Sequence, residues 1–168
     1  MVFLIILVIS AAILAMLFLK HKNKNLNTLH GEEMPYKRKK LLSEAESNFY
    51  QVLRTVVPPD RQITCKTRLE DLLYVENNSR KQIFRNRIKS KHVDFTVFNP
   101  VNGYTDFAIE LDDKSHTSKK QIEADIFKNE VFRKIGMPLI RIPAKRQYDP
   151  SEIIEMIRKQ STAPDSGK

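Results

Sequence analysis

The chain has 168 residues, enough for one domain with appended segments. It carries 29 lysine and arginine residues against 20 acidic residues, a formal net charge of +9. This balance favours nucleic acid or an anionic membrane surface as a partner, although a merely solvated basic surface stays open. The single cysteine, Cys65, excludes an intramolecular disulfide and a cysteine-rich zinc site.

Residues 2–19 are uncharged, and Ser10 is the one polar residue among them. At about 1.5 Å per residue, a helix of this length just spans a ~30 Å hydrocarbon core, which predicts a transmembrane anchor over residues 1–20. A cleaved signal peptide is the alternative, but only Met1 precedes the apolar run where a basic region is expected. Basic residues follow at once, so the positive-inside rule predicts a single-pass protein of the cell inner membrane whose C-terminal domain is cytoplasmic.

Residues 21–40 are predicted to form a basic linker, which ends in the four basic residues 37–40. This run could lie on anionic lipid, contact nucleic acid or simply be solvated. The sequence does not separate these three alternatives.

A domain is predicted over residues 41–160, with a disordered tail over residues 161–168. Ser43 and Glu46 fit the capping-box pattern at the start of its first helix. Helical periodicity predicts buried faces at Ile122, Ile126, Val131 and Ile135 and at Ile153, Ile154 and Ile157. The predicted elements are helices over about 43–56, 69–73, 119–135 and 149–159, and strands over about 62–66, 93–98, 107–112 and 139–142. This order predicts a mixed sheet flanked by helices, an α/β sandwich.

A polar and basic stretch, residues 77–90, precedes the central strands. Dense positive charge of this kind suits contact with a phosphate backbone, and a solvated face is the alternative. The predicted nucleic-acid-binding residues are Arg80, Lys81, Arg85, Arg87 and Lys89.

Carboxylates gather at the ends of the two central strands. Asp94 lies in one apolar run, and the next run ends in Glu110 and Asp112. Because successive side chains alternate between faces, Glu110 and Asp112 share a side, and a hairpin would place Asp94 on the neighbouring strand. Crowded carboxylates repel one another and lose hydration, and a hard divalent cation usually offsets that cost. With His116 and Asp125 just beyond, this is the layout of a metal-dependent phosphodiesterase.

These residues resemble the restriction-endonuclease-like superfamily, the PD-(D/E)xK nucleases. Asp94 and Glu110 match the first two acidic positions of that pattern, whereas Asp112 stands at the position of the lysine. The Glu110-Leu111-Asp112 block, followed by His116 and Asp125, is similar to the branch that contains the very-short-patch-repair endonucleases. Over residues 41–143 the chain looks closest to a bacterial family called domain of unknown function 2726.

The resemblance implies a restriction-endonuclease-like fold and a bound Mg²⁺ or Mn²⁺. Asp94 and Glu110 would hold the cation, with Asp112 as a second-shell or second-metal ligand. The cation would activate a water molecule and stabilise charge on the scissile phosphate.

The resemblance also assigns roles to two residues beyond the strands. His116 would act as general base or orient the attacking water, and Asp125 would orient His116. Since the usual lysine is missing, its positive charge would have to come from Lys114, Lys119 or Lys120.

Two further residues are weaker candidates, Glu46 and Arg141. A capping box explains Glu46 as well, and a structural ion pair explains Arg141. The sequence thus predicts a membrane-anchored cytoplasmic domain with a nuclease fold, a Mg²⁺-dependent phosphodiesterase acting on DNA. The alternative is a catalytically inactive nuclease-fold module that binds nucleic acid or a protein partner at the membrane. The missing lysine favours the module, whereas the retained carboxylates favour the enzyme.

Overall fold

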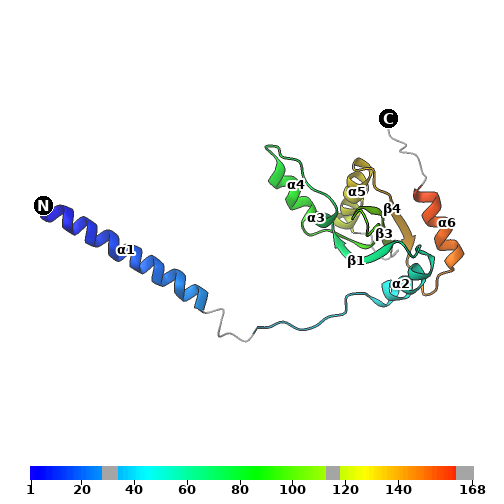
Figure 1. Cartoon of the computed structure of the whole chain (residues 1–168), viewed down its shortest axis with the longest axis horizontal. Helices are drawn as coiled ribbons and strands as arrows, with labels where there is room; N and C mark the ends of the chain where they lie inside the picture. The colour runs from blue at the N-terminus through cyan, green and yellow to red at the C-terminus, as the bar shows by residue number, and fades with distance from the viewer. Residues whose placement is uncertain (28–33, 113–117, 162–168) are drawn as a thin grey trace. The chain divides into compact units, whose positions relative to one another are not determined.

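The computed structural model describes residues 1–27, 34–112 and 118–161 (Figure 1). By its internal contacts the chain divides into two units, Met1–Lys39 and Lys40–Lys168, which are described separately. The first unit contains helix α1, Val2–Asn27, and the second contains the remaining helices and strands of the described residues.

The N-terminal apolar run forms a helix, but α1 continues through Lys20, Lys22 and Lys24 to Asn27. Among the residues that the structure describes, no helix has the length and the apolar character needed to cross a membrane. The predicted transmembrane anchor is therefore wrong, and so is the single-pass location in the inner membrane that was inferred from it.

The second unit is built on one four-stranded sheet in the order β1-β2-β3-β4. Its strands are β1 (Gln62–Arg68), β2 (His92–Phe98), β3 (Thr105–Asp112) and β4 (Leu139–Pro143). The first three strands pair antiparallel, whereas β4 lies parallel to β3. A parallel pair needs a crossover, and helix α5 (Lys119–Lys134) supplies it. The predicted mixed sheet flanked by helices is confirmed.

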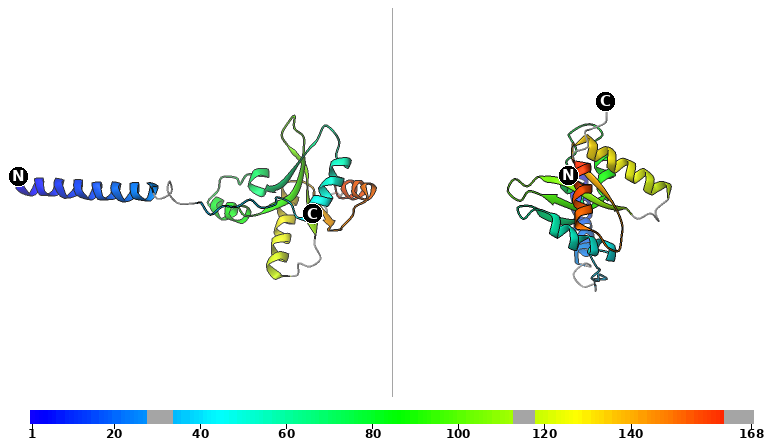
Figure 2. Two further views of the ribbon diagram at one scale, coloured as in Figure 1. Left: turned by 90° about the horizontal axis from the view of Figure 1, so that it is seen from below. Right: turned by 90° about the vertical axis from the view of Figure 1, so that its right-hand side faces the viewer.

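Helices cover both faces of this sheet (Figures 1 and 2). On one face, α2 (Glu44–Val56) and α6 (Pro150–Ser161) bury Phe49, Leu53 and Ile153 against the strands. On the other face, Phe132 of α5 packs with residues of the short helix α3 (Leu69–Leu72) and of α4 (Lys81–Ile88). The sheet is thus the middle layer between two groups of helices.

The predicted capping box is confirmed at the start of α2. The Ser43 hydroxyl accepts a hydrogen bond from the Glu46 amide, and the Glu46 carboxylate accepts one from the Ser43 amide at 2.8 Å. Two of the helix's otherwise unpaired N–H groups are satisfied in this way. The helix ends where Val57 becomes extended before Pro58.

The predicted buried faces of the last two helices need correction. In α5, Ile122, Ile126 and Ile135 are 50%, 54% and 42% exposed, whereas Phe132 is 1% exposed. In α6, Ile153 is buried but Ile154 is 51% exposed. The α5 error arises because a lysine, Lys128, occupies the inward face one turn before Phe132. Counting apolar residues alone therefore selected the wrong side of the helix.

Candidate active site

The carboxylates of Asp94 and Glu110 meet at the end of the β2–β3 hairpin. Phe95 pairs with Ile109 in the register, so Asp94 and Glu110 stand opposite each other one step beyond. One Asp94 oxygen, Oδ2, accepts the amide hydrogen of Leu111 at 2.9 Å, which fixes this carboxylate against β3. Glu110 is only 8% exposed. Two carboxylates in a water-poor place repel one another unless positive charge comes close.

Lys66 of β1 brings one positive charge to Asp94. Its ammonium donates hydrogen bonds to Asp94 Oδ1 at 2.8 Å and to Glu46 Oε1 at 2.5 Å. The backbone of Lys66 has φ +56°, the left-handed region, which costs a non-glycine residue about 1–2 kcal/mol. Such strain tends to persist where the surrounding structure requires it, often at functional sites.

Lys128 of α5 brings a second positive charge to Glu110. Its ammonium donates to Glu110 Oε1 at 2.5 Å, and its side chain is 13% exposed. Burial raises the pKa of Glu110 above the usual glutamate value, Lys128 acts against this, and Asp94 raises the pKa further.

Arg141 of β4 supplies the third cation. Its guanidinium donates to Asp112 at 2.8 Å, contacts Asp125 at 3.3 Å and lies 3.7 Å from Glu110 Oε2. Asn129 also accepts a hydrogen bond from it at 3.2 Å. Arg141 therefore joins the two carboxylates of β3 to Asp125 of α5.

Together these side chains form one acidic network, which joins all four strands of the sheet and two helices, α2 and α5. Within the described residues, five carboxylates are linked to three cations, a formal net charge of −2 when all are ionised. The carboxylates are Glu46, Asp94, Glu110, Asp112 and Asp125, and the cations are Lys66, Lys128 and Arg141. In a chain of net charge +9, this is a local excess of two negative charges.

A cavity of about 620 Å³ adjoins the network. Its walls come from the start of β2, the end of β3 and one side of α5. The lining residues are His92, Glu110, Leu111, Asp112, Gln121, Ala124, Asp125 and Lys128. Volumes of this size are typical of ligand-binding clefts.

Each of the three predicted metal ligands has a cationic partner: Asp94 pairs with Lys66, Glu110 with Lys128 and Asp112 with Arg141. Among the described residues no group of three His, Cys, Asp or Glu side chains is placed to hold a metal. The excess of two negative charges beside Asp94 and Glu110 nevertheless fits one divalent cation. A Mg²⁺ or Mn²⁺ site at Asp94, Glu110 and Asp112 stays a prediction.

The remaining predicted catalytic residues have different outcomes. His116 and Lys114 lie outside the described residues, so the predicted general base has no position in this structure. Asp125 was predicted to orient His116, and the structure places its carboxylate beside Arg141 and 3.8 Å from Lys128. Lys119 is exposed at the start of α5.

Sequence reasoning missed Lys66 and Lys128 as members of the site. Lys128 had a usable signal, because Lys128 and Phe132 are four residues apart and so share a helix face. For Lys66 no local signal exists, since nothing around it in the sequence predicts a left-handed backbone.

All five residues of the predicted nucleic-acid-binding cluster are exposed, and three of them contact a neighbouring side chain. Arg85 is tied to Glu70 at 3.3 Å, and Arg80 lies over the ring of Phe84. Arg87 lies instead 4.2 Å from the centre of the Phe127 ring in α5, next to Lys128. Lys91 lies 5.2 Å from the same ring. Arg87 and Lys91 therefore hold positive charge beside the helix that lines the cavity.

The mixed sheet and the charged network at its edge define an α/β domain with a candidate active site. A family model described as "Protein of unknown function (DUF2726)" matches residues 38–160, and the chain belongs to this family. No match was found among curated proteins or among solved structures.

Proposed function

We propose that the second unit is a nuclease-like domain that hydrolyses phosphodiester bonds in nucleic acid, DNA in the first instance, with a divalent cation. The observation that carries this proposal is the opposed pair Asp94 and Glu110, each with a lysine ammonium attached. The residue pattern resembles that of PD-(D/E)xK nucleases and of the very-short-patch-repair branch among them. The pairing of two carboxylates with nearby lysine suits the chemistry of that class.

Two carboxylates and two lysines of the network would have different roles in this reaction. Asp94 and Glu110 would hold the cation, whose charge activates water and offsets the charge developing on the phosphate. Lys128 and Lys66, already hydrogen-bonded to these carboxylates, would place ammonium groups beside the reacting phosphate. They stand in for the lysine that Asp112 replaces, although they come from α5 and β1 rather than from β3.

The surroundings of the cavity favour a polyanionic substrate. Arg87 and Lys91 both contact Phe127, one residue from Lys128, so a strand tracking them would pass beside the cavity. Ion pairs with phosphates supply most of the sequence-independent affinity for nucleic acid. The net charge of +9 acts in the same direction.

A second candidate is a nuclease-fold module that binds nucleic acid or a protein partner without catalysis. The observation that favours it is the ion pairing of Asp112 with Arg141, together with two lysines already bonded to Asp94 and Glu110. A network whose carboxylates are already paired with lysine and arginine needs no bound metal ion to offset their charge.

A cleavage assay on the purified full chain separates the two candidates. Plasmid, linear duplex and single-stranded DNA are incubated with Mg²⁺ or Mn²⁺, with and without chelator, for the wild type, Glu110→Gln and the surface control Glu155→Gln. We expect cleavage that chelator abolishes, that Glu110→Gln loses and that Glu155→Gln keeps. The cation should also raise the thermal stability of the wild type but not that of Glu110→Gln.

Two results would contradict the enzymatic proposal. Cleavage that persists in Glu110→Gln would mean that this carboxylate is not part of the active site. A wild-type chain that binds DNA and cleaves none of the substrates would leave the non-catalytic module.

A further inference from the structure

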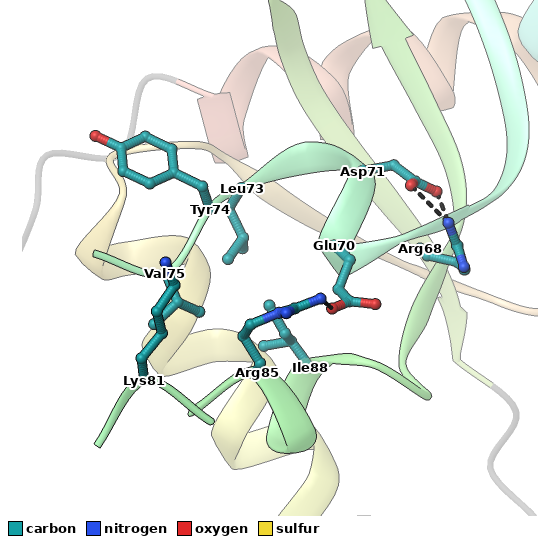
Figure 3. Close-up of a pocket in the computed structure, with 9 residues that line it drawn as sticks. All are labelled: Arg68, Glu70, Asp71, Leu73, Tyr74, Val75, Lys81, Arg85 and Ile88. Atoms are coloured by element: carbon teal, nitrogen blue, oxygen red, sulfur yellow. Dashed lines mark hydrogen bonds and ion pairs between the residues drawn. The ribbon is translucent and has the colours of Figure 1, made fainter. Parts of the chain in front are cut away.

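A second pocket, of about 470 Å³, lies between α3, the segment after it and α4 (Figure 3). It has no lining residue in common with the cavity beside Glu110. The side chains that give it its chemistry are Glu70, Leu73, Tyr74, Lys81, Arg85 and Ile88. It is therefore a separate site with its own mixture of apolar, aromatic and charged groups.

The aromatic group is Tyr74, which is 84% exposed at the rim of this pocket. Its neighbour Leu73 packs against the core with Ile88, so these two residues form the apolar floor. The chain thus turns one apolar side chain inward and presents the next, a large flat ring, to solvent. An exposed ring beside an apolar floor is a surface on which a planar group can stack.

The charged groups come from one face of α4 and from α3. Lys81 and Arg85 are four residues apart and so share a helix face. Arg85 donates to Glu70 at 3.3 Å, and the Glu70 side chain is 18% exposed. No carboxylate of the described residues pairs with Lys81. Lys81 thus offers positive charge to an anion, while the Glu70–Arg85 pair offers an acceptor and donors nearby.

We propose that this pocket takes one unpaired nucleotide of a nucleic-acid strand. Its base stacks on the exposed ring of Tyr74 at the rim of the pocket, its phosphate lies near Lys81, and Glu70 and Arg85 offer hydrogen-bonding groups on the pocket side. A paired base offers no free face for such stacking, so the pocket selects single-stranded or locally opened nucleic acid. The inference rests on the proposed function for its choice of a strand as the ligand, since a free nucleotide has the same groups.

Binding measurements on the full chain test this assignment. Fluorescence anisotropy in chelator follows a labelled 12-nucleotide single strand and the blunt duplex of the same sequence, and AMP serves as the free-nucleotide probe. Stacking of one base predicts that Tyr74→Ala weakens single-strand binding about tenfold. Duplex binding should change less than about twofold, and Tyr74→Phe, which keeps the ring, should behave as wild type.

Two further variants sharpen the result. Tyr104→Ala is the matched control, because Tyr104 is 77% exposed but precedes β3, at the other end of that strand from Glu110. It should leave single-strand affinity unchanged. Lys81→Ala should reduce the slope of log K against log salt for the single strand by about 0.7, as the loss of one phosphate contact requires.

Three outcomes would overturn the inference. The wild type could fail to bind the single strand, or Tyr74→Ala and Tyr104→Ala could weaken single-strand binding equally. Tyr74→Ala could also weaken duplex binding as much as single-strand binding. AMP binding as tight as that of the oligonucleotide would overturn the assignment to a strand. The cleavage assay with Glu110→Gln tests the proposed function separately. If the wild type cleaves no substrate but Tyr74→Ala weakens single-strand binding, the proposed function is refuted and the nucleotide site is supported.

Discussion

Glu110 shows how a single side chain is held between opposing influences. Burial raises its pKa, Lys128 and Arg141 act to lower the pKa, Asp94 acts to raise it, and the net direction is upward. The folded protein therefore keeps this proton to higher pH than the unfolded chain does. The stability linked to Glu110 is fully present below the unfolded pKa and is lost as the pH rises through the folded pKa.

The neighbours of Glu110 should move its pKa in opposite directions. Asp94→Asn removes a nearby negative charge and should lower the Glu110 pKa, whereas Lys128→Met removes the paired cation and should raise it. Side-chain carboxyl ¹³C NMR in metal-free buffer measures both shifts against wild type. Glu155, whose pKa the guanidinium of Arg158 lowers, is an internal reference that neither variant should affect. Shifts of the same sign in both variants would contradict the arrangement described.

Because the backbone of Lys66 is left-handed, glycine should be a more stable replacement than alanine at this position, the reverse of the usual order in a strand. Lys66→Ala and Lys66→Gly both remove the ammonium, but glycine also relieves the strain at φ +56°. We therefore expect Lys66→Gly to be more stable than Lys66→Ala by about 1 kcal/mol in urea unfolding. At Gln62, an exposed position of the same strand with ordinary φ, alanine should be more stable than glycine. The same order at both positions would mean that Lys66 is unstrained in solution.

At the scale of the element, helix α6 protects the edge of the sheet. The Arg141 amide donates to Gln160 Oε1 at 2.9 Å, and Gln160 Nε2 donates to the Arg141 carbonyl at 3.2 Å. The side-chain amide thus occupies backbone groups that another strand could otherwise pair with. Because Arg141 also binds Asp112, α6 helps to hold the site from the outer edge of β4.

Loss of the Gln160 amide should therefore have a measurable cost. Gln160→Ala leaves a partly buried amide and carbonyl without these partners, and we expect it to lower the free energy of unfolding by about 1–2 kcal/mol. Gln82→Ala, on the exposed face of α4, should change it by no more than about 0.5 kcal/mol. Urea unfolding compares them, and equal effects would show that Gln160 contributes nothing special to the edge.

The elements that sequence patterns predicted well are those with local signals. The capping box at Ser43, the helix ending at Gly136 and the hairpin of β2 and β3 all depend on neighbouring residues. Helix α4 was missed because its few apolar residues stand among many charges. The inward side of α5 was predicted wrongly because Lys128 faces inward. A lysine is stable there because it pairs with the carboxylate of Glu110 in β3, which the sequence of α5 does not reveal. The opposition of Asp94 and Glu110 followed from strand alternation, whereas their cationic partners come from distant segments.

At the scale of the whole molecule, the described hydrophobic core belongs to one of the two units. Every residue of the two described core clusters belongs to the second unit, and the packed apolar residues begin at Leu42.

Removal of the first unit should leave the fold intact. We expect a fragment of residues 40–168 to unfold within about 2 °C of the full chain, because its core and capping box are complete. A fragment of residues 48–168 lacks Ser43 and Glu46 and should unfold at a clearly lower temperature. Thermal unfolding followed by circular dichroism compares them. A large loss in the longer fragment would mean that residues 1–39 stabilise the domain.

The carboxylate of Glu46 has two partners, because one oxygen accepts a hydrogen bond from the Ser43 amide and the other accepts one from the Lys66 ammonium. Any fraying of the first turn of α2 must loosen Lys66, and through it Asp94. Local unfolding of the first turn of α2 should therefore be coupled to loss of the Lys66–Asp94 contact in the site. Hydrogen exchange at Ser43 and at Leu111, residues far apart in the sequence, should then follow a common opening equilibrium.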